Sequence, residues 1–407
     1  MNETTVLKHH FVGATLLIAG CCIGAGMLGL PLVTSLSGFF PSLVALVISW
    51  LFMLCTGLLL VEVYLYYKDQ ISLVSMAKRT TGNIGAFICW VTFLFLFYFL
   101  LVAYVSASGS IIVDFFSHYL EIKTPVIVPT FILTFFLGVV IFLGTESTDH
   151  INRFLMGGLI ISYLVLVSVA IPYIDSENLT YVNWGEAAFI LPTFVVSFGY
   201  HNLIPGISNY LKRNAKAIRW AVIIGSSIPF FVYIIWEWVL LGIIPVEGES
   251  GFREALRLGK LPSNLLHQVV GHSAVGTFSD LFSFFAITTS FLAVSLSLTD
   301  FLADGLKMPK TNKMNRMLLC LIVLIPPFIF GLSDPTLFIK ALNHAGGICA
   351  IVLYGLLPCF MVWRGRYHFN EPTTPQVFGG KLMLILICLI SCTIITLHLV
   401  HVLGGIS

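Results

Sequence analysis

Long apolar stretches recur along this chain, and each is about as long as one helix needs to cross a lipid bilayer. A membrane-spanning helix requires about 20 mostly apolar residues. We therefore predict about eleven transmembrane helices, at 11–36, 40–66, 86–113, 126–144, 154–174, 187–209, 218–244, 274–300, 316–332, 338–363 and 380–403. Only 10% of the residues are charged, whereas soluble domains have about 25%. The chain is therefore expected to be an all-α integral membrane protein with the lipid bilayer as its solvent.

The basic residues predict the orientation of the chain in the membrane, because Lys and Arg are enriched in cytoplasmic loops. With a cytoplasmic N-terminus, sixteen of the 21 Lys and Arg fall on the cytoplasmic side. The other five fall on the opposite side: Lys123, Arg253, Arg257, Lys260 and Lys340. Eleven spans then place the C-terminus on that opposite side.

Two long connections, 67–85 and 245–273, indicate an internal repeat. Each follows the second helix of a five-helix set, and because five is odd they emerge on opposite faces of the membrane. An inverted-topology repeat has this pattern. We predict a first five-helix repeat at 1–175, a second, inverted repeat at 176–364, and an additional helix within 365–407. No sequence identity between the halves is visible.

The first helix of each predicted repeat is interrupted. Residues 20–31 contain four glycines and Pro31, and residues 197–202 turn polar between Pro192 and Pro205. Glycine costs about 1 kcal/mol and proline about 3 kcal/mol inside a helix. Small residues also let neighbouring helices approach closely, which is the alternative interpretation. Two interruptions at corresponding positions favour a transporter's substrate site, where half-helix ends present amide and carbonyl groups.

The sequence lacks the motifs that are typical of metalloproteins, ATP-driven transporters and nucleic-acid-binding proteins. The nine cysteines form no C-x-x-C pair and no Cys/His set at zinc spacing. No Walker A loop is present, so we expect neither ATP nor any other cofactor, and no metal. The net charge of +2 gives no reason to expect a nucleic-acid partner, and no obligate protein partner is indicated. A polytopic membrane enzyme or a channel remain less favoured alternatives.

A set of motifs in chain order resembles the bacterial aromatic amino acid permeases, most closely their tyrosine-specific members, over essentially the whole length. The motifs are Ile23–Leu28 with Leu30 and Pro31, Leu60–Tyr64, Ala77–Arg79, Asn152–Leu155, Ser197–His201 with Pro205, Tyr210, Arg219 with Trp220, Ile223–Ser226, Ile228 with Pro229, Thr289–Leu292, Asp300, and Leu302–Asp304. The resemblance implies a leucine-transporter-like fold. It also implies cation symport, with a proton as the expected cation, of tyrosine or a related aromatic amino acid across the bacterial inner (cytoplasmic) membrane, with a periplasmic C-terminus. Another neutral amino acid as substrate stays open.

The resemblance also implies a substrate site built from the two interruptions. Amides of Ala25 and Gly26 are expected to receive the substrate carboxylate, and Tyr98 and Tyr104 to stack on its ring, with packing as the alternative. His201 suits both substrate contact and proton handling, or is simply hydrogen-bonded. The predicted substrate-binding residues are Gly20, Cys21, Cys22, Ile23, Gly24, Ala25, Gly26, Met27, Tyr98, Tyr104, Ser197, Phe198, Gly199, Tyr200 and His201.

The predicted coupling-ion residues are Glu62, Thr289, Ser290 and Asp300. Ionisable groups within membrane spans are costly, and hence functional candidates. Glu62 is a candidate proton acceptor or a neutral side chain near the inner face, and Asp300 is a candidate or a helix-end anchor. Thr289 and Ser290, with Gly20 and Ile23, match a sodium site of leucine-transporter-like proteins. The second sodium site of these proteins usually needs Asn at the position of Met27. This difference gives no support for sodium coupling at that site but does not exclude it. Glu237 is a further buried carboxyl, expected near the outer face.

Overall fold

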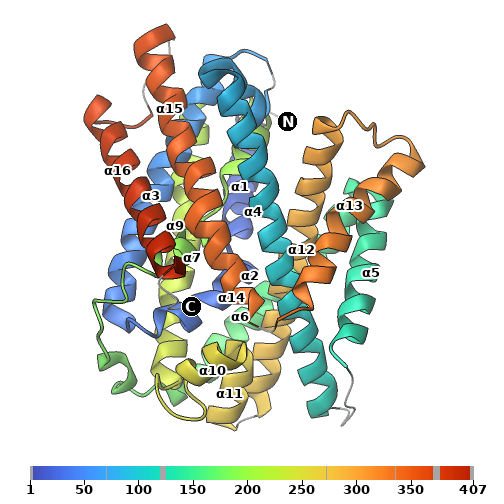
Figure 1. The fold of residues 1–407 in the computed structure, drawn as a ribbon, viewed down its shortest axis with the longest axis vertical. Helices are drawn as coiled ribbons and strands as arrows, with labels where there is room; N and C mark the ends of the chain where they lie inside the picture. The colour runs from blue at the N-terminus through green and yellow to red at the C-terminus, as the bar shows by residue number, and fades with distance from the viewer. Residues whose placement is uncertain are drawn as a thin grey trace.

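The computed structural model describes residues 3–69, 71–119, 125–271, 273–334, 336–369 and 376–403, and within these ranges it contains helices and no strand. Figure 1 shows an elongated bundle. Its first half consists of α1 (Glu3–Cys22), α2 (Ala25–Thr34), α3 (Phe39–Tyr66), α4 (Leu73–Tyr119), α5 (Ile127–Leu143), α6 (Thr145–Ala170), η1 (Ile171–Tyr173) and η2 (Asn178–Thr180). Its second half consists of α7 (Leu191–Ser197), η3 (His201–Leu203), α8 (Ile204–Tyr210), α9 (Ala215–Ile243), α10 (Phe252–Leu258), α11 (Pro262–Val270), α12 (Ser273–Gly305), α13 (Lys313–Gly331), α14 (Leu337–His344), η4 (Ala345–Leu356), α15 (Leu357–Arg364), η5 (Gly365–Phe369) and α16 (Gly380–Leu403).

Eight described helices are long and apolar enough to cross a membrane, and the bent pair α1–α2 makes a ninth. The other two predicted spans, 126–144 and 187–209, correspond to α5, of 17 residues, and to the interrupted series α7–η3–α8. The prediction of an all-helical membrane protein is therefore confirmed. The count of eleven spans stays a prediction, since two of the segments are shorter than a full span.

Both long connections contain helices. Gly82, with φ +80°, separates the short first part of α4 from its long membrane segment. The connection 245–273 holds α10 and α11, which end at Gly259 and Gly271 in the left-handed conformation. Glycine adopts this conformation without the steric cost that a Cβ atom imposes. The two connections are thus compact caps on the bundle.

Contacts of arginine side chains gather several connections at one end of the molecule, which we call the basic end. Arg213, after α8, donates to the carbonyl oxygen of Asp69, after α3, at 3.4 Å. Arg316 donates to the carbonyl of Phe142, near the end of α5, at 3.1 Å. The basic end is uppermost in Figure 1, on the side of the N-terminus, and α10 and α11 lie at the lower end, the α10–α11 end.

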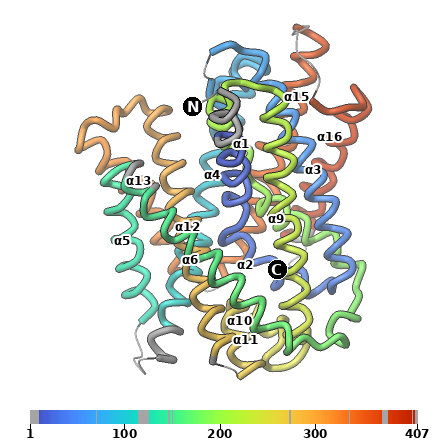
Figure 2. Tube along the Cα trace, turned by 180° about the vertical axis from the view of Figure 1, so that it is seen from behind, coloured from blue at the N-terminus to red at the C-terminus, as the bar shows by residue number. Residues whose placement is uncertain are grey.

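The helices form two groups around a shared centre. α9 packs against α1, α2 and α3, and α7 packs against α2 and α3. In the second group, α4, α5, α12 and α13 pack against one another, and α6 lies along α12. The segment 337–369 is the most buried of the candidate spans and contacts α4 and α7. Figure 2 shows α6, α9 and α12 from behind, with α5 at the edge of the bundle.

Prolines inside spans leave backbone carbonyls without a helical donor, and aromatic side chains supply one. Pro31 lacks the N–H that would bond to the carbonyl of Met27, and the indole of Trp236 donates to that oxygen at 3.1 Å. Pro326 likewise frees the carbonyl of Ile322, to which the hydroxyl of Tyr98 donates at 2.8 Å. Both contacts keep polar backbone groups satisfied where lipid offers no water.

Candidate functional site

The first interruption separates α1 from α2, which are bent by 48°. Only Ile23 and Gly24 lie between the two helices. The amide of Ala25 donates to the hydroxyl of Ser290 on α12 at 2.8 Å. A Cβ atom on Gly24 would lie 2.2 Å from that same oxygen. Gly24 thus leaves room for the Ser290 side chain to reach the amide of Ala25.

The second interruption separates α7 from α8 by three residues and the short helix η3. Pro192 and Pro205 occupy the first turns of α7 and α8, where a missing N–H is harmless. The hydroxyl of Tyr200 donates to the carbonyl of Met53 on α3 at 3.1 Å. A Cβ atom on Gly57 would lie 2.4 Å from that hydroxyl, so Gly57 makes room for it.

The two interruptions face each other. A Cβ atom on Gly26 would lie 3.0 Å from the Ser197 hydroxyl oxygen, and the Cys21 thiol donates weakly to the Gly199 carbonyl at 3.7 Å. The hydroxyl of Tyr233, on α9, lies 2.6 Å from the carbonyl oxygen of Cys22 and 2.9 Å from that of Ser197. The last residues of α1 and α7 therefore meet at one tyrosine hydroxyl.

His201 is fully buried beside the second interruption. Its ring stacks between those of Tyr200 and Tyr354, with centroids 4.9 and 4.6 Å away. Its Nε2 lies 2.9 Å from the hydroxyl of Thr56, which itself donates to the carbonyl of Met53 at 3.2 Å. Which of the two atoms donates in this contact depends on the tautomer of the ring. Nδ1 is buried with no hydrogen-bond partner in the described structure.

The two tyrosines predicted to stack on a substrate ring lie in different places. Tyr104 is buried on α4, and its hydroxyl interacts with that of Ser290 beside Cys21, so it belongs to the region of the interruptions. Tyr98 instead directs its hydroxyl to α13, as described above. Of the two, Tyr104 alone is placed near the predicted site.

The predicted coupling-ion residues are spread over three places. Thr289 donates to the carbonyl of Phe285 in its own helix at 2.8 Å, whereas Ser290 contacts the first interruption. Asp300 pairs with Lys310 at 2.5 Å, with its side chain 46% exposed, at the basic end. This location suits the helix-end anchor that the sequence left open for it.

Glu62 lies near the basic end in a buried ion pair. Arg366 donates to both carboxylate oxygens of Glu62, at 2.6 and 2.7 Å. The Tyr66 hydroxyl and the Gln376 amide donate to the same carboxylate at 3.0 and 2.8 Å. These four hydrogen bonds tie Glu62, on α3, to η5 and to the segment before α16.

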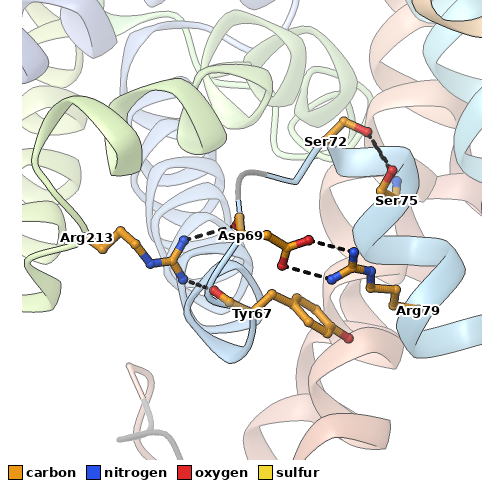
Figure 3. Close-up of polar contacts among 6 residues, drawn as sticks. All are labelled: Tyr67, Asp69, Ser72, Ser75, Arg79 and Arg213. Atoms are coloured by element: carbon orange, nitrogen blue, oxygen red, sulfur yellow. Dashed lines mark hydrogen bonds and ion pairs between the residues drawn. The ribbon is translucent and has the colours of Figure 1, made fainter.

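The connection between α3 and α4 is held by a polar cluster at the basic end (Figure 3). Arg79 donates to both oxygens of Asp69, at 3.0 and 2.7 Å, and its guanidinium lowers the pKa of that carboxyl. From the other side, Arg213 donates to the carbonyls of Tyr67 and Tyr64, the latter at 3.1 Å. A cation at these carbonyls favours the C-terminal end of α3.

The structure also singles out residues that the sequence did not assign to a site. Tyr233 joins the two interruptions, and Thr56 and Tyr354 enclose His201; these residues look like ordinary span residues, and no signal in the sequence distinguishes them. Glu237 was noticeable as a carboxyl between two tryptophans. It proves to be buried against Thr34 of α2, with its Oε2 2.5 Å from the threonine hydroxyl.

Comparison with known proteins shows the family to which the chain belongs. The model of the tryptophan/tyrosine permease family matches residues 7–398. Tyrosine-specific transport systems 1 and 2 of Haemophilus influenzae are 33% and 32% identical to the chain, over 97% and 96% of it and 96% of each relative. The low affinity tryptophan permease of Escherichia coli K12 is 30% identical, over 97% of the chain and 96% of that relative. The chain is therefore a transporter and not an enzyme, and it belongs to the tryptophan/tyrosine permease family.

Proposed function

We propose that this protein carries tyrosine, or a related aromatic amino acid, into a bacterial cell by symport with protons and by alternating access. The observation that carries the proposal is the meeting of two interrupted helices at Tyr233. Interrupted helices at the same depth bring backbone amides and carbonyls to a binding site inside the membrane. The tyrosine-specific relatives from Haemophilus influenzae support tyrosine as the substrate.

The substrate carboxylate binds at the first turn of α2, where the amides of Ala25 and Gly26 have no partner within the helix. Ser290 now accepts the hydrogen of the Ala25 amide, so the substrate must share or replace this contact. The aromatic ring lies on the side of Tyr104, which is near both Ser290 and Cys21. Gly20–Met27 and Ser197–His201 together enclose the amino acid.

The proposed architecture consists of two inverted five-helix repeats, 1–175 and 176–364, followed by the helix within 365–407. Its support is that helices at matching positions pack together: α2 against α7, α3 against α9, α4 against α12, and α5 against α13. The basic end faces the cytoplasm, since it gathers the connections richest in Lys and Arg. The α10–α11 end then faces the periplasm of the inner membrane.

Transport into proteoliposomes tests the substrate and the coupling ion. We expect uptake of labelled tyrosine against its gradient when the outside is acidified, and little effect of replacing sodium by choline. Unlabelled tyrosine, tryptophan and phenylalanine as competitors rank the aromatic substrates, with tryptophan as the second candidate because of the tryptophan permease relative. Accumulation driven by sodium alone, or competition by non-aromatic amino acids alone, would contradict the proposal.

Gly26→Val tests the site itself. The valine side chain would collide with Ser197 across the interruptions, since even a Cβ atom lies 3.0 Å from its hydroxyl oxygen. We expect loss of uptake with normal abundance in the membrane. Gly157→Val is the matched control, because a Cβ atom there meets nothing within 4 Å. Normal uptake by the Gly26 variant would exclude a site between these two segments.

A further inference from the structure

Glu237, on α9, is a buried carboxyl group that forms no ion pair with any residue the structure describes. Its side chain is 1% exposed. One carboxyl oxygen, Oε2, lies 2.5 Å from the hydroxyl oxygen of Thr34 on α2. The other, Oε1, is buried with no hydrogen-bond partner in the described structure. A lone ionised carboxylate in this position would be very costly.

The hydroxyl of Thr34 indicates which group holds the hydrogen of this contact. Its oxygen lies 2.9 Å from the carbonyl of Leu30, one turn back in α2, and can donate its single hydrogen there. The hydrogen between Thr34 and Glu237 is then supplied by the carboxyl. A protonated Glu237 brings no charge into this dry contact and can donate to Thr34, whereas an ionised Glu237 would be buried beside no described cation.

The elements packed against this part of α9 bring no counter-charge to Glu237. α2 has no titratable side chain, and neither have residues 39–54 of α3. On α6, the Tyr163 hydroxyl donates to a carbonyl of α9 at 3.0 Å, and on α11, His267 pairs with Asp280 at 2.9 Å. In the connection after α6, the titratable side chains are acidic or phenolic and not cationic: Tyr173, Asp175 and Glu177 are exposed, and Tyr181 and Glu186 are half-buried. The described titratable side chains elsewhere on α1, α3, α6 and α9 lie further toward the basic end: His10, Cys21, Cys22, Cys55, Glu62, Tyr64, Tyr66, His150, Arg153, Lys216, Arg219 and Tyr233.

Glu237 shares its helix with the groups that hold both interruptions. Trp236 donates to the freed carbonyl of Met27 in α2, and Tyr233, one turn earlier, contacts the ends of α1 and α7. Residues 233 and 237 lie on the same face of a helix. The Glu237–Thr34 contact therefore continues a line of polar contacts between α9 and the interrupted span.

From these contacts we propose that Glu237 is the group that binds the transported proton, and that its protonation holds α2 against α9. This proposal rests on the proposed proton symport. A proton from the α10–α11 side neutralises the carboxylate, and the neutral carboxyl then closes the dry contact with Thr34. Loss of the proton toward the basic end restores a charge that cannot stay in that contact, so α2 separates from α9 and water reaches the carboxylate.

The position of Glu237 suits access from the α10–α11 end. It lies six residues before the end of α9 at Ile243, which is about 9 Å along the helix axis. Buried hydroxyls continue from Thr34 in the same direction: Ser37 lies 2.9 Å from Ser42, and Ser37 also donates to the carbonyl of Thr34 at 2.9 Å. A short opening between α2 and α9 would thus expose a row of polar groups to a proton donor.

The decisive experiment compares two transport modes of the same reconstituted protein. Counterflow of labelled tyrosine into vesicles preloaded with unlabelled tyrosine needs no ion gradient and reports substrate movement alone. Accumulation driven by one pH unit across the membrane stores about a tenfold tyrosine gradient for one proton per substrate. For Glu237→Gln, which keeps the shape and neutrality of the protonated carboxyl, we expect near-normal counterflow and loss of the tenfold accumulation. Glu177→Gln, which removes an exposed carboxyl at the same end, should retain both.

Each outcome bears on one claim. Accumulation by Glu237→Gln equal to wild type would overturn the role of Glu237 while leaving proton symport intact. Absence of pH-driven accumulation in the wild type would overturn proton symport itself. Should the Gln variant not reach the membrane, Glu237→Asp serves instead: it keeps a titratable group, so pH-driven accumulation must persist with a shifted pH optimum. An unchanged optimum would overturn the proposal as well.

Discussion

The two ends of the molecule hold their helices together in opposite ways. At the basic end, charged groups are matched by charges: Glu62 by Arg366, Asp69 by Arg79, and Asp300 by Lys310. Toward the α10–α11 end, the contact between α2 and α9 contains one carboxyl with no cation, Glu237. Glu62 and Glu237 have the same exposure, 1%, yet the first is paired with an arginine and the second contacts a threonine hydroxyl.

This difference shows that burial alone does not identify a proton-binding carboxyl. The sequence marks Glu62 and Glu237 equally, as acidic residues in apolar stretches. What separates them is the partner, and only the three-dimensional structure supplies it. An ion pair tolerates the presence of water, whereas a neutral carboxyl in a dry contact responds to each gain or loss of a proton.

Arg366→Ala gives the largest expected effect on stability, because it leaves the carboxylate of Glu62 buried without a cation. Removing one partner of a buried pair costs about 3–5 kcal/mol, and we expect roughly 3 kcal/mol since Arg366 is partly exposed. The apparent melting temperature in detergent should fall accordingly. The control is Arg364→Ala, which removes a neighbouring arginine whose guanidinium lies over the Phe369 ring, 5.5 Å from its centroid. An equal fall in that variant would contradict the special role of the Glu62–Arg366 pair.

The double variant Glu62→Gln with Arg366→Met sharpens the same comparison with a smaller effect. Removing both charges leaves neither group buried alone, and neutral replacements of buried pairs are often well tolerated. We expect the melting temperature to recover about half of the loss caused by Arg366→Ala. A double variant less stable than either single variant would show that the pair does not act as a unit.

Asp69→Asn should have a still smaller effect, because this ion pair is exposed to solvent. Arg79 lowers the pKa of Asp69, so the stabilisation by the ionised pair is present at neutral pH. It is lost as the pH falls through the lowered pKa. The difference in melting temperature between wild type and variant should therefore shrink in acid. A difference that grows on acidification would contradict the assigned pairing.

Glu237→Gln should change the melting temperature least of all. The carboxyl is neutral in the contact with Thr34, and an amide of the same shape can donate to the same hydroxyl. A loss comparable to that of Arg366→Ala would mean that Glu237 carries a charge in the folded protein, and the contrast between the two ends would then be wrong.

The sequence predicted the features that depend on local chemistry. The interruptions at 20–27 and 197–201 followed from glycine and proline, and the structure breaks both helices there. The sequence did not reveal partners distant along the chain. Arg366 lies 304 residues from Glu62, and no periodicity connects them. The sequence also places Tyr98 at the site. In the structure its hydroxyl donates to the carbonyl of Ile322 on α13, which has no amide donor because residue 326 is a proline.

The hydroxyl of Tyr233 has one hydrogen and lies within reach of two carbonyl oxygens, those of Cys22 and Ser197. It can satisfy only one of them fully at a time. The ends of α1 and α7 therefore present two carbonyl acceptors to a hydroxyl that has one hydrogen to donate. The ammonium group of an amino acid has three N–H donors. A free amino acid supplies what the protein lacks at this point, and a molecule without a protonated amine does not.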